Sequence, residues 1–305
     1  MSSIANTTHS PTVVDYDPFA GSAILRVVPT TESQREVWLA DQFGEDASLA
    51  FNESVSLRFK GPLQVDALIG ALQELVQRHE ALRATTSANG EELVIAADAV
   101  INVELSNFTS LNAVDQDANI SAARQRVVET PFHVEKGPLF RAEILKFGSE
   151  DHFLILTAHH IICDGWSFGI LVRDLAKLYA HRTNGIDSAL APARSFGDYA
   201  SALADAHGNE SQMADEKYWL SRFTGTPPVL DLPTDRARPV WRTFSARRED
   251  YVLDAALVAD VRKIGALSGS SLDSTKQLCG ANTTSWWLDR CCDRRSGRRS
   301  ICGRV

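Results

Sequence analysis

The sequence predicts an α/β protein, of the α+β kind in which helices form a second layer against β-sheet. Some segments alternate apolar and polar residues as half-buried strands do, and Glu53–Lys60 is the clearest of them. Other segments place apolar residues at helical spacing, as Val65–His79 does with a continuous leucine-rich stripe. Because both periods recur along one chain, sheets and helices are expected to share a core.

Composition limits the classes of function. The 305 residues are 44% hydrophobic and 23% charged, as in an ordinary soluble protein. The net charge of -8 argues against a nucleic-acid partner, because affinity for phosphate backbones comes mainly from clustered Lys and Arg. No stretch approaches the roughly 20 apolar residues that cross a bilayer, and no basic-then-apolar leader opens the chain. We therefore expect a cytoplasmic protein without membrane contact.

The first elements follow a polar lead-in. Residues 1–24 are polar and interrupted by proline and glycine, so we expect them to be disordered, with structure beginning near Val28. Pro29–Gln42 is predicted to be a helix, because Thr30 or Thr31 can accept hydrogen bonds from its first free N–H groups.

The remaining elements continue the alternation of strand and helix. Further strands are predicted at Leu93–Ala96, Ile101–Leu105, Gly137–Phe147, His152–Thr157 and Tyr251–Leu253, and further helices at Ile120–Glu129, Phe168–Ala180, Ser195–Ala206, Met213–Phe223 and Ala255–Ala266. The short separation at residues 148–151 predicts a hairpin. Pro227–Pro239 is expected to be a surface segment, and Trp38 and Trp219 are expected in the core.

Breaks in composition suggest the domain organisation. The Ala, Pro and Ser-rich segment Ser188–Ala193 predicts a linker, so we expect one lobe over 25–185, and the linker with the beginning of a second lobe over 186–267. Residues 268–305 lose all periodicity, hold four of the five cysteines, and carry seven basic against three acidic residues, a net +4 that leaves -12 for the rest. This composition predicts a disordered basic tail for an anionic partner or a stretch translated out of frame.

The stretch Thr157–Ser167 holds the residues best suited to chemistry. His159 and His160 end an apolar strand, and Asp164 and Gly165 precede a helical pattern. Since successive side chains on a strand point to opposite faces, one histidine is expected to face the protein and the other a cavity.

The residue types of the same stretch allow two other kinds of chemistry, a zinc site and a cysteine nucleophile. A zinc site from the histidines and the aspartate is possible by residue type, although adjacent ligands on opposite strand faces argue against it. Cys163 is a candidate nucleophile beside a histidine, but residues so close along a strand end do not easily meet face to face, and buried structural thiols are common.

Five stretches, in order, resemble signatures of the condensation domains of nonribosomal peptide synthetases, a branch of the acyltransferases that resemble chloramphenicol acetyltransferase. His159–Gly165 is similar to their HHxxxDG motif. The other four are Thr31–Trp38, Arg78–Arg83, Ser195–Tyr199, and Tyr218-Trp219 with Leu230–Pro239. The match covers the whole first lobe and only the beginning of the second, so the chain looks truncated there.

The resemblance implies amide formation in nonribosomal peptide or hybrid polyketide-peptide biosynthesis, a branch of secondary metabolism. In the family an acceptor amine attacks an acyl or peptidyl thioester in a tunnel between two similar lobes. No cofactor is expected to bind directly, because the substrates are carried on phosphopantetheine arms of peptidyl or acyl carrier proteins. Those carriers and the neighbouring synthetase modules are the expected partners.

The resemblance also assigns residue roles. His160 matches the second histidine of the motif and is expected to act as a general base or to position the amine, since a histidine with its reference pKa of about 6.5 is largely neutral at cytoplasmic pH. His159 is expected to face inward and support the loop.

Asp164 and Gly165 are given supporting roles. Asp164 is expected to order the loop by accepting backbone N–H groups or by pairing with an arginine, for which Arg78 and Arg83 are candidates. Gly165 is expected to permit a tight turn, and its N–H is a candidate donor to the developing oxyanion. Two alternatives to an active enzyme stay open: a truncated, inactive remnant, and a module that binds carrier proteins without turnover.

Overall fold

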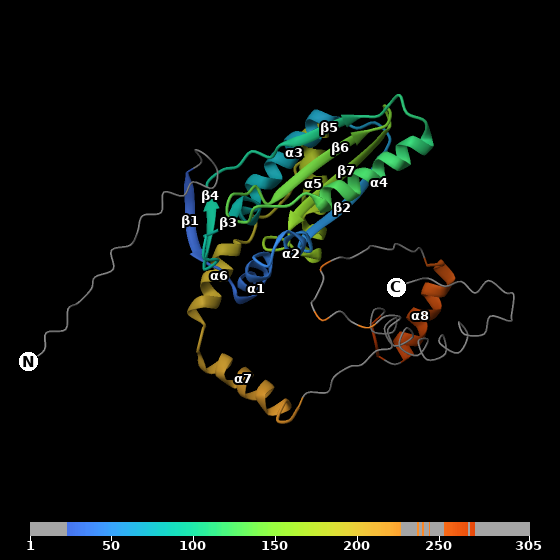
Figure 1. The fold of residues 1–305 in the computed structure, drawn as a ribbon. Helices are drawn as coiled ribbons and strands as arrows, with labels where there is room; N and C mark the ends of the chain where they lie inside the picture. Colours follow the sequence, from blue (N-terminus) through green and yellow to red (C-terminus); the bar gives the residue numbers. More distant parts are fainter. Residues whose placement is uncertain are drawn as a thin grey trace, which may run out of the picture. The chain divides into compact units, whose positions relative to one another are not determined.

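The computed structural model describes residues 23–226, 237, 240, 244, 253–267 and 269–271. The elements are, in order, β1 (Ile24–Pro29), α1 (Glu32–Asp41), α2 (Glu45–Leu49), β2 (Asn52–Lys60), α3 (Val65–Arg78), the 3₁₀ helix η1 (Glu80–Arg83), β3 (Ala84–Thr86), β4 (Glu92–Ala96), β5 (Val103–Asn107), α4 (Ala113–Glu129), β6 (Phe140–Lys146), β7 (Asp151–His159), α5 (Gly165–Asn184), α6 (Phe196–Asp205), α7 (Glu210–Arg222) and α8 (Ala255–Leu267) (Figure 1). All but α8 belong to a unit that ends at Ser245, and α8 belongs to a second unit, 246–305.

A four-stranded sheet in the order β2-β7-β6-β5 carries the central motif. The predicted hairpin is confirmed, because β6 and β7 pair antiparallel with Lys146 opposite His152. On the other side of β7, strand β2 pairs antiparallel over its whole length, with Asn52 opposite His159. This register places the start of β2 beside the end of β7, more than a hundred residues later in the chain.

Helices cover both faces of this sheet (Figure 1). On one face, Leu154 and Leu156 of β7 share a core cluster with residues of α3 and α5. On the opposite face, Phe153 and Ile155 pack with residues of α4. The alternation along β7 therefore divides its side chains between two cores, as the period of a strand requires. The α/β class is confirmed, and the second layer of helices adds a third layer to the two expected.

A smaller sheet in the order β1-β4-β3 lies beside the first. The expected start of structure near Val28 is wrong, because β1 already begins at Ile24. Leu25 and Val27 are exposed and Val28 is buried, so this edge strand lacks the clean apolar alternation by which a strand is recognised. The short elements α2 and β3 were not predicted either.

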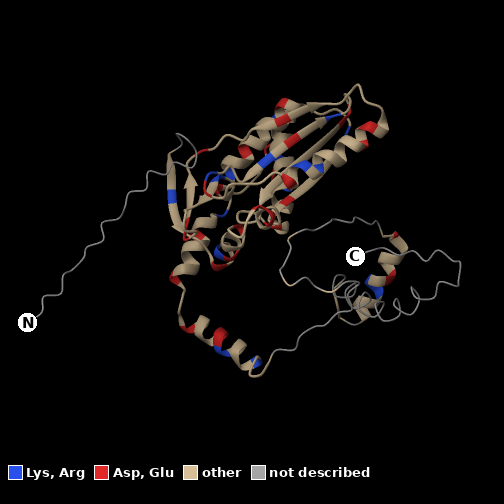
Figure 2. Cartoon of the chain, viewed as in Figure 1, with Lys and Arg blue, Asp and Glu red and all other residues tan. Residues whose placement is uncertain are grey.

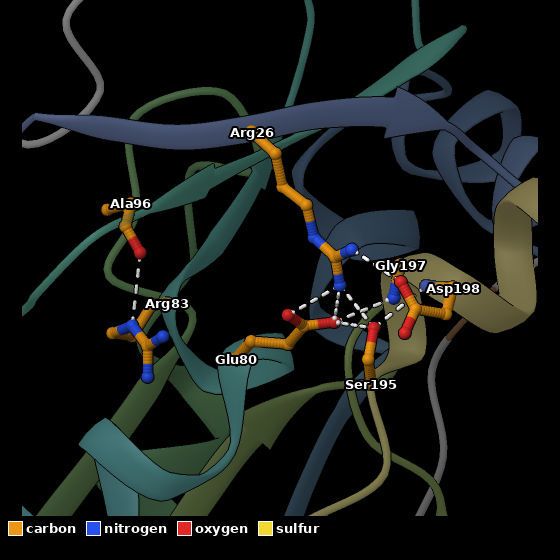
Figure 3. A network of polar contacts seen from close by, with 7 residues as sticks. All are labelled: Arg26, Glu80, Arg83, Ala96, Ser195, Gly197 and Asp198. Carbon is orange, nitrogen blue, oxygen red and sulfur yellow. Dashed lines mark hydrogen bonds and ion pairs between the residues drawn. The ribbon is translucent and has the colours of Figure 1, made fainter.

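An ionic cluster attaches α6 to this smaller sheet (Figure 3). Arg26 on β1 approaches Glu80 at 2.5 Å and Asp198 at 2.6 Å. The Glu80 carboxylate also accepts hydrogen bonds from the Gly197 N–H at 2.7 Å and the Ser195 hydroxyl at 2.8 Å. We call these five residues the Arg26 clamp. It joins β1, η1 and the start of α6, three elements far apart in the sequence.

The helix end at Arg78–Glu80 is not the solvated segment that its charges suggest. Arg78 and His79 each lie 3.1 Å from the buried Asp174 of α5. Arg83 is buried and donates to backbone carbonyls, including that of Ala96 at 3.1 Å. This motif therefore ties α3 to α5 and to the smaller sheet, which is a structural role.

The two tryptophans that were predicted to lie in the core differ in their burial. Trp38 is half-buried and packs against a core cluster, whereas Trp219 is 60% exposed on α7, so its predicted place in the core is wrong. None of the residues of α7, all of which are described, is buried. Acidic and basic residues are mixed along the helices of the first unit (Figure 2).

Several predictions fall on residues outside the described ranges. These are the disorder of residues 1–22, the surface segment Pro227–Pro239 apart from Ala237, the strand Tyr251–Leu253 apart from its last residue, and nearly all of the tail 268–305. The lobe boundary near residue 185 stays a prediction. Among the described helices, none combines the length and apolar character that a bilayer crossing needs.

Candidate active site

The loop between β7 and α5 is shaped by a helix cap. Asp164 is the N-cap of α5 and accepts hydrogen bonds from the Ser167 N–H at 2.8 Å and the Ser167 hydroxyl at 2.5 Å. The Ser167 hydroxyl, followed by its N–H, holds the pKa of Asp164 below its usual value. The expectation that Asp164 accepts backbone N–H groups is thus met by the geometry. The suggested pairing with Arg78 or Arg83 is wrong, because these side chains contact Asp174 and backbone carbonyls.

His159 is fully buried, as expected of the inward-facing histidine. Its Nδ1 accepts from the Ile161 N–H at 3.3 Å, so the proton of the neutral ring lies on Nε2. Nε2 is 3.5 Å from Asp41 Oδ1, an ion-pair distance without good hydrogen-bond geometry. Burial acts to raise the pKa of Asp41, but the contacts with His159 and Ser48 outweigh it and lower the pKa.

His160 differs from His159 because its side chain is 37% exposed. Its Nδ1 lies 3.0 Å from the Cys163 carbonyl oxygen and 3.2 Å from Glu53 Oε1. The Cys163 carbonyl can only accept a hydrogen bond, and the Glu53 carboxylate lies at an ion-pair distance, so the arrangement assigns the ring proton to Nδ1. In the neutral ring, Nε2 then carries the free lone pair. This is the form that can accept a proton from a bound amine.

The loop that carries His160 is braced by residues whose role was not visible in the sequence. Gln34 of α1 is buried and donates to the Ile161 carbonyl at 2.8 Å, which explains a polar residue inside the opening helix motif. The Phe51 ring stacks on His160 with centroids 6.5 Å apart. Glu53 belongs to a strand whose alternating pattern predicted only its fold. The register of β2 against β7 brings Phe51 and Glu53 to the site.

Gly165 is the first residue of α5 and does not adopt a left-handed backbone conformation, so the turn does not require glycine there. A Cβ at this position would meet no atom within 4 Å, which means that the space beside it is open. As a first helical residue its N–H has no intrahelical acceptor. Its service as an oxyanion donor stays a prediction.

The structure gives little support to a Cys163 nucleophile or to a zinc site. Burial raises the pKa of the Cys163 thiol to about 12, so this thiol is not poised as a nucleophile at neutral pH. Within the described ranges, no three His, Cys, Asp or Glu side chains are grouped as a metal ion requires.

A hollow of about 510 Å³ lies near the end of α1, on the side of the buried histidine. Its lining includes Asp41, Glu45 and His133 but not His160 or Gly165. We place the candidate active site at His160, because its Nδ1 faces the Cys163 carbonyl and the Glu53 carboxylate, while its Nε2 has no hydrogen-bond partner among the described residues.

Comparison with known proteins shows the family to which the chain belongs. A family model described as "Condensation domain" matches residues 24–277. Phosphinothricin tripeptide synthetase PhsC of Streptomyces viridochromogenes is 35% identical over 254 residues, which cover 80% of this chain and 23% of that protein. Surfactin synthase subunit 1 of Bacillus subtilis is 33% identical over 248 residues, covering 80% of this chain and 6% of the relative.

Solved structures share the fold. The starter condensation domain of rhizomide synthetase superposes with a TM-score of 0.60 at 22% identity, covering 68% of this chain and 51% of that one. A four-domain nonribosomal peptide synthetase bound to AMP and glycine gives a TM-score of 0.65 at 19% identity, covering 83% of this chain and 19% of that structure. The chain thus spans about half of the solved starter domain and a small part of each synthetase.

Proposed function

The chain belongs to the condensation-domain family, and from this premise we propose that it forms an amide bond between a carrier-tethered acyl or peptidyl thioester and an acceptor amine. The product would be an intermediate of nonribosomal, or hybrid polyketide-peptide, synthesis. The observation that carries the proposal is the surroundings of the partly exposed His160 ring: its Nδ1 faces the Cys163 carbonyl and the Glu53 carboxylate, and its Nε2 has no hydrogen-bond partner among the described residues.

The chemistry requires one proton to move. The neutral amine nitrogen attacks the thioester carbonyl carbon, a C–N bond forms, and the carbonyl oxygen gains negative charge. His160 Nε2 accepts the proton that the amine nitrogen loses. The C–S bond then breaks, and the imidazolium returns the proton to the leaving thiolate. The open space beside Gly165 suits a thioester oxygen near the first N–H groups of α5.

His160 also contributes to the reaction if it orients the amine and does not accept its proton. A lone pair fixed in direction by the Nδ1 contacts would hold the amine in line with the carbonyl carbon, and a positioned pair of reactants gains rate without any proton transfer. The substrates in either case are thioesters on phosphopantetheine arms. Peptidyl and acyl carrier proteins and neighbouring modules are therefore the proposed partners.

The test is amide formation by the full chain with one acyl-loaded and one aminoacyl-loaded carrier protein, followed by mass spectrometry of the carriers. We expect product from the wild type and a fall of about 10²- to 10⁴-fold in rate for His160→Ala. His207→Ala is the matched control, because His207 is exposed and distant in sequence from the loop.

Three outcomes decide the proposal. Product that persists at the wild-type rate in His160→Ala would exclude the assigned role of His160. Carrier binding without any product from the wild type would favour a binding module. Neither binding nor product would favour a remnant without activity.

A further inference from the structure

Among the described residues, Glu53 is the acidic side chain that makes an ion-pair contact with the ring of His160. Its Oε1 lies 3.2 Å from Nδ1, and its side chain is only 34% exposed. Its Oε2 is buried and lacks a hydrogen-bond partner within the described part of the chain. The carboxylate therefore gives up much of its hydration to stand beside the histidine.

The position of Glu53 is fixed by backbone pairing. On β2, Glu53 lies opposite Ala158 of β7, and its neighbour Asn52 lies opposite His159. The His160 N–H donates to the Phe51 carbonyl at 2.8 Å, which extends the same pairing past the end of β7. The contact between carboxylate and ring thus follows from the sheet register and does not depend on a freely rotating surface chain.

Asp164 is a second carboxylate close to the ring, but it is engaged elsewhere. It interacts with His160 through its charge, while its hydrogen bonds go to Ser167 at the start of α5. The Cys163 carbonyl holds the Nδ1 proton but carries no full charge. Glu53 is the group that supplies negative charge at Nδ1.

On the basis of the function proposed above, we propose that Glu53 is a positioning residue for His160. With the Cys163 carbonyl it keeps the proton on Nδ1 and fixes the direction of the Nε2 lone pair. When Nε2 accepts the proton of the amine, the ring becomes an imidazolium, and the Glu53 carboxylate stabilises that charge. The substrate amine and thioester do not touch Glu53 in this scheme.

The first experiment compares kinetic constants of Glu53→Gln and wild type in the carrier assay. The amide keeps the size and the acceptor oxygen but removes the charge. Because the imidazolium forms only during the reaction, we expect kcat to fall about 10-fold while KM changes by less than about 2-fold. Glu36→Gln, an exposed position on α1, is the control and is expected to leave both constants unchanged. An unchanged kcat, or a raised KM alone, in Glu53→Gln would overturn the proposal.

A second experiment needs no carrier protein and stays informative if the wild type makes no amide. Diethyl pyrocarbonate reacts with the lone pair of a neutral imidazole, and peptide mass spectrometry reports the modification rate of each histidine in the full chain. At pH 8.5 we expect modification of His160 to be about 2- to 5-fold slower in Glu53→Gln, since an acceptor of lower charge at Nδ1 leaves Nε2 less nucleophilic. His207 in the same sample is the internal reference. Equal rates at His160 in both proteins would overturn the proposal.

Two further measurements separate this role from a structural one. Glu53→Asp keeps the charge at a longer distance, so it is expected to recover part of both rates. Thermal melting by circular dichroism checks that each variant is folded. Loss of both rates in a Glu53→Asp protein that melts like the wild type would also contradict a role based on charge.

Discussion

Asp174 is a buried carboxylate that two arginines and a histidine share. Its exposed fraction is 1%, and Arg78, His79 and Arg173 lie within 3.3 Å of its oxygens. Burial acts to raise the pKa of Asp174, but these contacts outweigh it and lower the pKa. A charge in this position stabilises the junction of α3 and α5 only while its partners remain, because an uncompensated buried charge is costly.

Replacing this carboxylate should destabilise the first unit. We expect Asp174→Ala to lower the free energy of unfolding by about 3 kcal/mol at pH 7, because Arg78 loses its counter-charge and His79 loses its hydrogen-bond partner. The Asp174 pKa is lowered in the fold, so its contribution is complete above the unfolded value of about 3.9 and is lost as pH falls through the folded value. The difference between the proteins should therefore shrink below pH 4.

Urea unfolding at several pH values measures this difference. Asp215→Ala, at an exposed position on α7, serves as the control and is expected to change stability by less than about 0.5 kcal/mol. An Asp174→Ala protein as stable as the wild type at pH 7 would mean that water satisfies the two arginines and His79 in place of the carboxylate.

Among the elements, α6 depends on the Arg26 clamp for its attachment. Glu80 stands at the helix N-terminus, where the Gly197 N–H and the Ser195 hydroxyl donate to it. Burial acts to raise the pKa of Glu80, but the Gly197 N–H, Ser195 and Arg26 outweigh it and lower the pKa. The Glu80 carboxylate of η1 thus takes the place of water at the Gly197 N–H, at the start of α6.

Loss of the Glu80 charge should loosen the start of α6 without unfolding the sheets. We expect Glu80→Gln to speed hydrogen exchange of the Gly197 amide about 10-fold, because a charge-assisted hydrogen bond becomes a neutral one. The lowered pKa means that the wild-type clamp holds above about pH 4.3 and opens as pH falls through the folded value. Glu36→Gln is the control, and unchanged Gly197 exchange in Glu80→Gln would show that backbone packing alone holds α6.

At the scale of the whole molecule, α7 stands apart from the packed sheets. Met213, Trp219 and Phe223 are each more than half exposed, and no residue of this fully described helix is buried. The chain spans about half of the solved starter condensation domain. Helix α7 has little tertiary packing to protect it, because most helical stability comes from a buried face.

Limited proteolysis should cut α7 before the packed helices of the first unit. We expect trypsin to cut after Lys217 and Arg222 before it cuts α3 or α5, leaving the two sheets and their helices as a resistant fragment. Mass spectrometry of the early fragments measures the order of cleavage. Early cuts within α3, at equal or faster rates, would show that the first unit opens as readily as α7.

The sequence predicted the class of fold well, because strand alternation and helical spacing are local signals. Helix α3 and the hairpin of β6 and β7 were found this way. Strand β1 was missed because its apolar residues do not alternate with burial, and Trp219 was misplaced because an aromatic residue at helical spacing was taken as buried.

Contacts between distant segments could not be predicted from these local patterns. Glu53 and His160 meet only through the register of β2 on β7, and Asp164 turned to Ser167 in place of an arginine. The charges of Arg78–Glu80 by themselves suggest a solvated helix end, because nothing local in the sequence shows that Asp174 and Arg26 approach this segment.

The Arg26 clamp restricts how chimeric chains can be made from two related proteins. Arg26, Glu80 and the segment at Ser195–Asp198 lie on three separate stretches that a crossover would readily take from different parents. A chimera that inherits Glu80 from one parent and a bulkier residue at Gly197 from another would lack room for Arg26, since a Cβ there would come within 2.6 Å of its guanidinium. Arg26, Glu80 and Ser195–Asp198 must therefore fit one another. A crossover that takes all of them from one parent preserves the attachment of α6 to β1.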